Sequence, residues 1–87
     1  MSIEHGFRSA KIFPLSFFPD GLHGTIVGVV ADVDLQGRLM GMGIFAGTRF
    51  QLLRRGSIAS NIPFLLAVDE TRIAIDHKIA EMILVEV

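Results

Sequence analysis

Short apolar runs bounded by turn-forming residues predict that most of this chain folds as β-strands. Residues 25–31, TIVGVVA, are β-branched apart from one glycine and one alanine, a composition typical of strands. Residues 48–55 alternate, with Phe50 and Leu52 on one face, as a half-buried antiparallel strand does. Further strands are predicted at residues 61–68, 71–75 and 83–87.

Proline, glycine and acidic residues mark the turns between these strands. Pro-Asp-Gly at 19–21 predicts a turn ahead of the first strand, because proline presets φ and glycine accepts a positive φ. Asp69 and Glu70 predict a tight turn. Pro63 has no N–H for a ladder, so the strand at 61–68 is expected either at a sheet edge or to start near this residue.

A helix of two to three turns is predicted between the first two strands. Asp32 or Asp34 can cap its N-terminus, and Leu35, Leu39 and Met42 recur at i, i+4 and i+7, so they share one inward face.

Glycines are predicted to end this helix. Gly43 stands where a left-handed cap is needed, and Gly47 stands at the turn into the next strand. Near the C-terminus, Asp76 can cap a single helical turn at residues 77–82. The fold class expected from these elements is mainly β, a small antiparallel barrel.

The chain of 87 residues is expected to form one domain with a thin core. Residues 1–13 mix charged and aromatic residues without a period and are predicted to be a flexible N-terminal arm, followed by a domain at 14–87. Hydrophobic residues make up 51% of the chain, more than so small an interior needs, so an apolar patch that contacts a partner is expected on the surface.

Charge and cysteine content exclude several classes of function. The formal net charge of -1 gives no basic surface for nucleic acid or for an anionic membrane. With no cysteine there are no disulfides and no thiolate metal sites, which fits a reducing compartment. No secretory leader and no apolar run long enough to span a bilayer is visible, so we expect a cytoplasmic protein that does not insert into the membrane.

No catalytic or metal-binding motif stands out. Only His77 and Glu81 have the i, i+4 spacing of a helical ligand pair, and two ligands are too few for a transition-metal site. No serine has a histidine partner placed by a recognisable motif, and the glycines at 37–47 form neither a P-loop nor a dinucleotide fingerprint. We expect no enzyme activity, no bound metal and no cofactor.

An ordered set of residues resembles the FeoA family, the small accessory proteins of bacterial ferrous-iron uptake. The set is Gly24 and Ile26, then Arg38-Leu39, Met42-Gly43-Ile44, Gly47-Thr48, Leu53, Ile73-Ala74-Ile75, Ala80, Ile83 and Val85-Glu86. The resemblance implies an SH3-like barrel with a short helical insertion and a role beside the FeoB permease, which carries a cytosolic GTP-binding domain. The same module is found as the C-terminal domain of DtxR-type repressors.

The motif positions of the resemblance are expected to be structural; they are Gly24, Arg38, Leu39, Met42, Gly43, Gly47 and Thr48. Arg38 is expected to pair with Asp34, four residues before it. The chain departs from the family at Gly41, where an acidic residue is usual, and in the loop SIASN at 57–61.

The apolar residues that the helix does not turn inward are predicted to bind a partner. With Leu35, Leu39 and Met42 facing the core, the hypothesis places the contact surface at residues 35–47. The anchors would be Met40, Ile44 and Phe45, with Arg49 or Arg55 on the rim. The alternative is that these side chains only cover the open end of the barrel.

The resulting interpretation is a protein-binding module that docks on the cytosolic part of a FeoB-type ferrous iron permease and stays peripheral to the inner membrane through that partner. One alternative is a homo-oligomer, a scaffold whose apolar edges, such as residues 61–68, pair between copies. Another is a metal-sensing domain.

Overall fold

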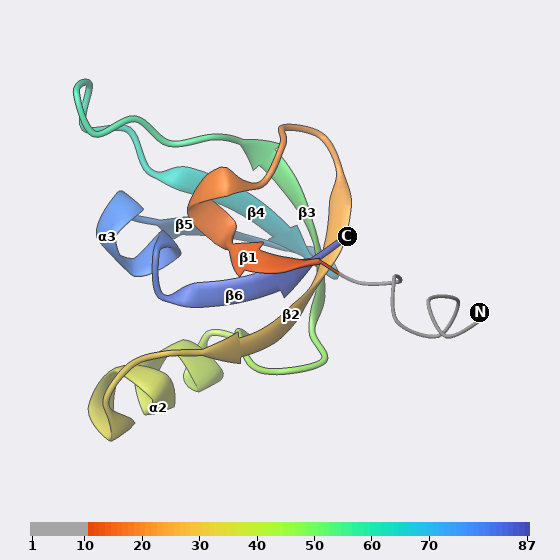
Figure 1. The fold of residues 1–87 in the computed structure, drawn as a ribbon, viewed down its shortest axis with the longest axis vertical. Coiled ribbons are helices and arrows are strands. Elements are labelled where there is room, and N and C mark those ends of the chain that lie inside the picture. Colours follow the sequence, from red (N-terminus) through yellow and green to blue (C-terminus); the bar gives the residue numbers. More distant parts are fainter. Residues whose placement is uncertain (1–10) are drawn as a thin grey trace, which may run out of the picture.

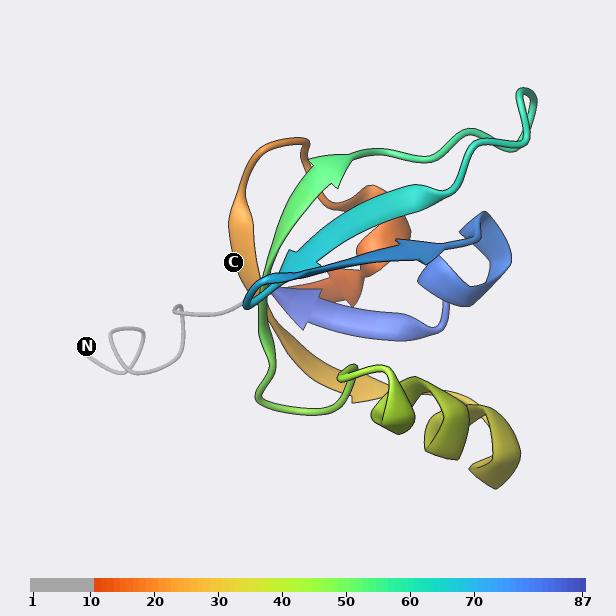
Figure 2. The ribbon, with the colours of Figure 1, turned by 180° about the vertical axis from the view of Figure 1, so that it is seen from behind.

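The computed structural model describes residues 11–87, which form one strongly curved antiparallel sheet with two short α-helices outside it (Figures 1 and 2). The strand order in the sheet is β1-β6-β2-β3-β4-β5. The strands are β1 (Ile12–Pro14), β2 (His23–Val29), β3 (Arg49–Arg54), β4 (Phe64–Val68), β5 (Thr71–Ile75) and β6 (Ile83–Glu86). The helices are the 3-10 turn η1 (Leu15–Phe17), α2 (Val33–Gly41) and α3 (His77–Ala80).

The predicted strands and turns are confirmed in order and type. Gly21 has a φ of 82° in the Pro-Asp-Gly turn, and Asp69 has a φ of 55° in the two-residue turn between β4 and β5. The carboxylate of Asp76 accepts a hydrogen bond of 2.8 Å from the N–H of Ile79 and so caps α3, as expected.

The N-terminal boundary of the domain was predicted wrongly. Ile12 and Phe13, expected in a flexible arm, lie in β1, where they pair with Glu86 and Val85 of β6. Phe13 also packs against the core, with its ring centroid 6.0 Å from that of Phe18. A three-residue strand shows too little alternation to be recognised, and only its pairing with β6 reveals it. Residues 1–10 of the predicted arm lie outside the described part of the chain.

The edges of the sheet also differ from the prediction. β4 lies between β3 and β5 and is paired along both sides, so residues 61–68 do not form an edge that could join two copies. Pro63 immediately precedes β4. Of the two expectations for this residue, the strand start is therefore confirmed and the edge position is wrong. The outer strands of the sheet are β1 and β5.

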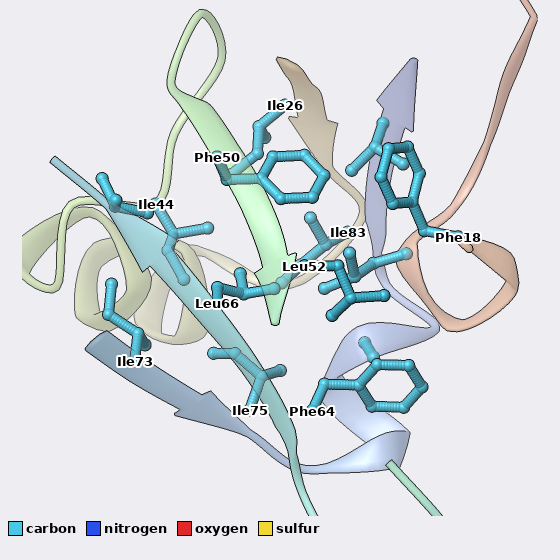
Figure 3. Packing of buried hydrophobic residues seen from close by; sticks show 14 of the residues in the cluster. Phe18, Ile26, Ile44, Phe50, Leu52, Phe64, Leu66, Ile73, Ile75 and Ile83 are labelled. Atoms are coloured by element: carbon cyan, nitrogen blue, oxygen red, sulfur yellow. The ribbon is translucent and has the colours of Figure 1, made fainter. Parts of the chain in front are cut away.

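The inner face of the curved sheet encloses a single hydrophobic core (Figure 3). Phe50, Leu52 and Leu66 meet Ile26 and Ile83 there, and all five are at most 2% exposed. η1 closes one side of this core with Leu15 and Phe18, the latter with its ring centroid 5.0 Å from that of Phe50. Because each such side chain contributes about 1.5–3 kcal/mol on burial, this cluster dominates the stability of the fold.

Arg55, the residue after β3, forms hydrogen bonds that hold η1 next to the end of this strand. Its guanidinium donates hydrogen bonds to the carbonyl oxygens of Phe18, at 2.6 Å, and Ser16, at 2.9 Å, and lies 5.5 Å from the ring centroid of Phe64. Arg55 is therefore a half-buried structural residue, and its predicted place on the rim of a contact surface is wrong.

Gly24 permits the close packing of η1 on the sheet. A Cβ atom at this position would come within 2.6 Å of Cζ of Phe18 and 2.8 Å of the carbonyl oxygen of Glu86. Gly28 lies in the same strand, at the register shift between β2 and β6, and nothing lies within 4 Å of a Cβ built there.

We expect Gly24→Ala to destabilise the domain by about 1–3 kcal/mol, because the added methyl group must displace both the Phe18 ring and the β6 backbone. Gly28→Ala is the matched control and should change the free energy of unfolding by less than about 1 kcal/mol. Urea unfolding of the two variants measures the difference. Equal stability for both would contradict the close contact at Gly24.

Arg55→Met should lower the free energy of unfolding by about 1–3 kcal/mol, because two carbonyl oxygens of the η1 segment lose their charged donor. Arg49→Met is the control, since the Arg49 side chain is exposed at the start of β3. Thermal unfolding followed by circular dichroism compares the two variants. A melting temperature equally little changed in both would show that Arg55 does not hold η1.

Candidate functional site

Hydrogen bonds hold the first turn of α2 next to the end of β2. Asp32 is its N-cap, and the carboxylate accepts a hydrogen bond of 2.8 Å from the N–H of Leu35. The side-chain amide of Gln36 donates to the carbonyl oxygens of Ala31, at 2.7 Å, and Val29, at 3.3 Å. The first turn of the helix is thereby tied to the end of β2.

The helix ends in a Schellman motif. Gly43 has a φ of 93°, its N–H donates to the carbonyl oxygen of Met40 at 3.0 Å, and the N–H of Ile44 reaches back to the carbonyl oxygen of Leu39 at 2.8 Å. The motif brings the residue after the glycine against the last inward-facing residue of the helix, and both Leu39 and Ile44 are at most 2% exposed. The predicted capping role of Gly43 is confirmed.

The prediction that Ile44 faces solvent is wrong. The Schellman reversal turns its side chain into the core, where it is 1% exposed (Figure 3). Met42, expected on the buried face, is instead 44% exposed. Met42 lines an open hollow beside α2 together with Leu35, which is only partly buried, so the inward face of the helix is not fully covered.

The segment after the helix forms a corner held by hydrogen bonds at Gly47 and Thr48. Gly47 has a φ of 96°, and its N–H donates to the carbonyl oxygen of Ile26 at 2.7 Å. The N–H of Ile26 returns a bond of 2.8 Å to Thr48, whose hydroxyl donates to the carbonyl oxygen of Gly43 at 3.0 Å. The corner is thus anchored to β2 and to the helix end.

Several large apolar side chains stay exposed around this anchored corner. Met40 is 59% exposed and Phe45 is 45% exposed, as predicted. We define the α2 surface as the exposed apolar residues in and next to α2 that lie outside the hollow, which are Val30, Val33, Met40 and Phe45. Met42 is two residues after Met40, about 200° round the helix, and lines the hollow instead.

Val30 and Val33 are 65% and 83% exposed and were not among the predicted contact residues. For Val33 the sequence pattern already indicated exposure. It precedes Met40 by seven residues, or two helical turns, and so lies on the same face of the helix.

The charged residues near this surface are unpaired within residues 11–87. Arg38 forms no ion pair with Asp34, contrary to expectation, because an exposed pair gains little Coulomb energy in water and must order the long arginine side chain. Arg38 instead lines the hollow beside α2, and Arg49 is exposed at the start of β3, opposite Thr25 of β2. Gly24 and Arg55 lie by η1 and do not belong to the α2 surface.

Two of the hollows that open on the outside of residues 11–87 lie beside the α-helices. One, of about 360 Å³, lies between α2 and the end of β5; it is lined by Leu35, Arg38, Leu39, Met42, Pro63, Ala74, Ile75, Asp76 and Ile79. The other, of about 520 Å³, lies between the β3–β4 loop and α3; it is lined by Ser57, Ile58, Asn61, Ile62, Pro63, Asp76, His77, Lys78 and Glu81. Neither was foreseen, because each is formed by segments distant in sequence.

In the described part of the chain, the acidic residues and histidines do not gather into a metal site. Among residues 11–87, no cluster of three or more histidines, aspartates and glutamates could hold an ion. His77 Nε2 lies 3.4 Å from the carboxylate of Glu81, and its ring stacks at a tilt against Phe64. His5 lies outside the described residues. In the same part of the chain, no helix is both long and apolar enough to cross a membrane.

Comparison with solved structures shows the same fold in other small proteins. An iron uptake regulatory protein, FeoA, superposes with a TM-score of 0.78 at 24% identity, covering 88% of this chain and 100% of that one. A FeoA-like protein from Clostridium acetobutylicum gives 0.72 at 23% identity, covering 88% and 87%. The predicted small SH3-like barrel is thereby confirmed.

A manganese-dependent transcriptional repressor also matches, with a TM-score of 0.76 at 21% identity. The match covers 97% of this chain but 46% of the repressor. A search of curated proteins finds no significant match.

The family model of the FeoA domain matches residues 13–87, which include the whole described sheet except the first residue of β1. Its range begins one residue after Ile12, close to the boundary that the sheet itself sets. The chain belongs to the FeoA domain family.

Proposed function

We propose that this protein is an accessory factor of ferrous-iron uptake that docks through its α2 surface on the cytosolic GTP-binding part of a FeoB-type permease. The observation that carries the proposal is the exposure of Met40 and Phe45 on a corner that hydrogen bonds hold rigid. Membership of the FeoA family supports the link to iron uptake.

The composition of the α2 surface fits a protein partner. Exposed methionine and phenylalanine provide apolar anchors, and Arg49 supplies a cation beside Thr48, at the edge of the corner. Because the backbone that carries the anchors is already held by the Schellman motif and the Thr48 hydroxyl, little backbone conformational entropy is lost on binding. Ile44 supports the surface from within and is not itself an anchor.

The proposed mechanism is conformational. A bound barrel favours whichever state of the permease it binds more tightly, and the shift equals its differential affinity for the two states. The proposal assigns no catalytic chemistry to this chain and leaves nucleotide turnover to the partner. Binding to the permease would place the protein at the cytoplasmic face of the inner membrane.

The alternative of a self-associating scaffold cannot use residues 61–68 as its edge, because β4 is paired along both sides, and would need an outer strand, β1 or β5, instead. The alternative of a metal sensor lacks support, because residues 11–87 contain no cluster of three or more possible metal ligands. The exposed apolar anchors next to α2 favour contact with a protein over metal sensing.

Replacing both exposed anchors should abolish docking without unfolding the barrel. We expect Met40→Asp with Phe45→Asp to raise the Kd for the purified cytosolic domain of the cognate permease by at least about tenfold, the effect of losing more than about 1.4 kcal/mol of anchor contacts. Biolayer interferometry in each nucleotide state of the domain measures the affinity.

Ile58→Asp is the matched control, since Ile58 is 70% exposed in the β3–β4 loop, away from α2. It should leave both the affinity and the melting temperature nearly unchanged. If the double variant binds as the wild type does, or if it fails to fold, the α2 surface is not the docking site but a cover for the barrel.

A further inference from the structure

The outer edge of β5 offers unpaired backbone groups at two residues. A two-residue turn joins β4 to β5, and Val68 pairs with Thr71 across it, so this is a hydrogen-bonded pair. Such pairs alternate along an antiparallel ladder, which leaves Arg72 and Ala74 with their N–H and C=O groups pointing away from β4. Within residues 11–87, no other element bonds to these groups.

The two outer strands of the sheet are protected unequally. β1 has three residues, ends in Pro14 and passes directly into η1, so it offers little backbone to another chain. β5 has five residues, no proline and an unbroken register with β4. Arg72 is its one charged residue. β5 has none of the features that protect β1, such as a very short length or a proline. It is therefore the open edge of this sheet, the one with which another chain can pair.

An apolar hollow lies beside that open edge. Ala74 and Ile75 of β5 line the 360 Å³ hollow together with Leu39 of α2, its C-cap Met42 and Ile79 of α3. Side chains of an extended chain alternate in direction, so a strand added to β5 can place one residue in this hollow. Because α2 and α3 flank the hollow, an extended segment fits it better than the broad edge of a second barrel.

Two cations flank the same place. Arg38 lines the hollow, and Arg72 is exposed two residues before Ala74, with no ion pair to either side chain among residues 11–87. Asp76 also lines the hollow and keeps its negative charge while one of its oxygens caps α3, so the two arginines leave the place with a net positive charge. The charges favour a segment that carries an acidic residue beside an apolar one.

We propose that β5 binds an extended segment of the partner as an added antiparallel or parallel strand, with an apolar side chain in the hollow beside α2 and an acidic side chain facing Arg38 and Arg72. Main-chain hydrogen bonds to Arg72 and Ala74 give the segment its register, and the hollow gives it selectivity. The identity of the partner rests on the proposed function, which makes the segment part of the permease's cytosolic domain.

Hydrogen exchange of the full chain tests the proposal without a variant. On addition of the cytosolic domain, the amide protons of Arg72 and Ala74 should exchange at least about tenfold more slowly, since they become donors in a new ladder. Binding of the domain with no change at these two amides overturns the strand addition and leaves the proposed function standing. Failure of the domain to bind at all overturns the proposed function itself.

Ala74→Pro and Ala74→Val form a matched pair of variants. Proline removes the outward N–H of Ala74 without removing a bond to β4, so the affinity for the domain should fall about fivefold or more, the effect of losing one hydrogen bond of about 1 kcal/mol. Valine keeps the N–H and should bind as the wild type does. Equal affinity of a folded proline variant and the wild type overturns the proposal.

The acidic requirement is tested with overlapping peptides that cover the cytosolic sequence of the permease. Peptides that bind should contain an acidic residue, and Arg38→Glu with Arg72→Glu should weaken them at least about fivefold, whereas Lys78→Glu, in the other hollow, should not. Binding confined to peptides without acidic residues overturns the charge assignment. Amide protection that rises with the concentration of this chain alone overturns the whole inference in favour of β5 pairing between two copies.

Discussion

The rest of the structure depends on the burial of one small apolar cluster inside a sheet that curls round it. Ile26, Leu52 and Ile83 come from three adjacent strands and are 0% exposed. A sheet of short strands has no second layer to cover it, so it must bend until its own inner face meets itself. The glycine at 24 and the guanidinium of Arg55 let η1 close the side that the strands leave open.

Because the core is small, it has little room for side chains from α2. The interior is filled by the strands and η1, and the helix contributes only Leu39, with Ile44 following through the Schellman motif. Its other apolar residues have no core to enter. Exposed side chains on a helix that is fastened at both ends form a rigid surface, and rigidity limits the entropy lost when a partner binds.

The open edge of β5 and the inward side of α2 meet at one hollow, which Ala74 and Met42 both line. Apolar anchors and a strand edge are complementary modes of recognition, because the first gives contact area and the second fixes the register of the bound chain. Together they describe a partner with one folded patch and one extended segment. A conformational effect on that partner follows if either element is available in only one of its states.

Local patterns in the sequence predicted the strands from β2 to β6 and the turns, because alternation and a positive φ at glycine are local rules. They also placed a capping carboxylate before each α-helix, with Asp32 and Asp34 as candidates for the first cap and Asp76 for the second. The sequence also identified Met40 and Phe45 as exposed. Other features depend on tertiary contacts, which local rules do not describe. The pairing of Ile12 with β6, the inward turn of Ile44 and the carbonyl contacts of Arg55 each depend on residues far away in the chain or on the exact path of the backbone. The hollow beside α2 exists only because segments some forty residues apart, at Leu35 and Ala74, are folded together.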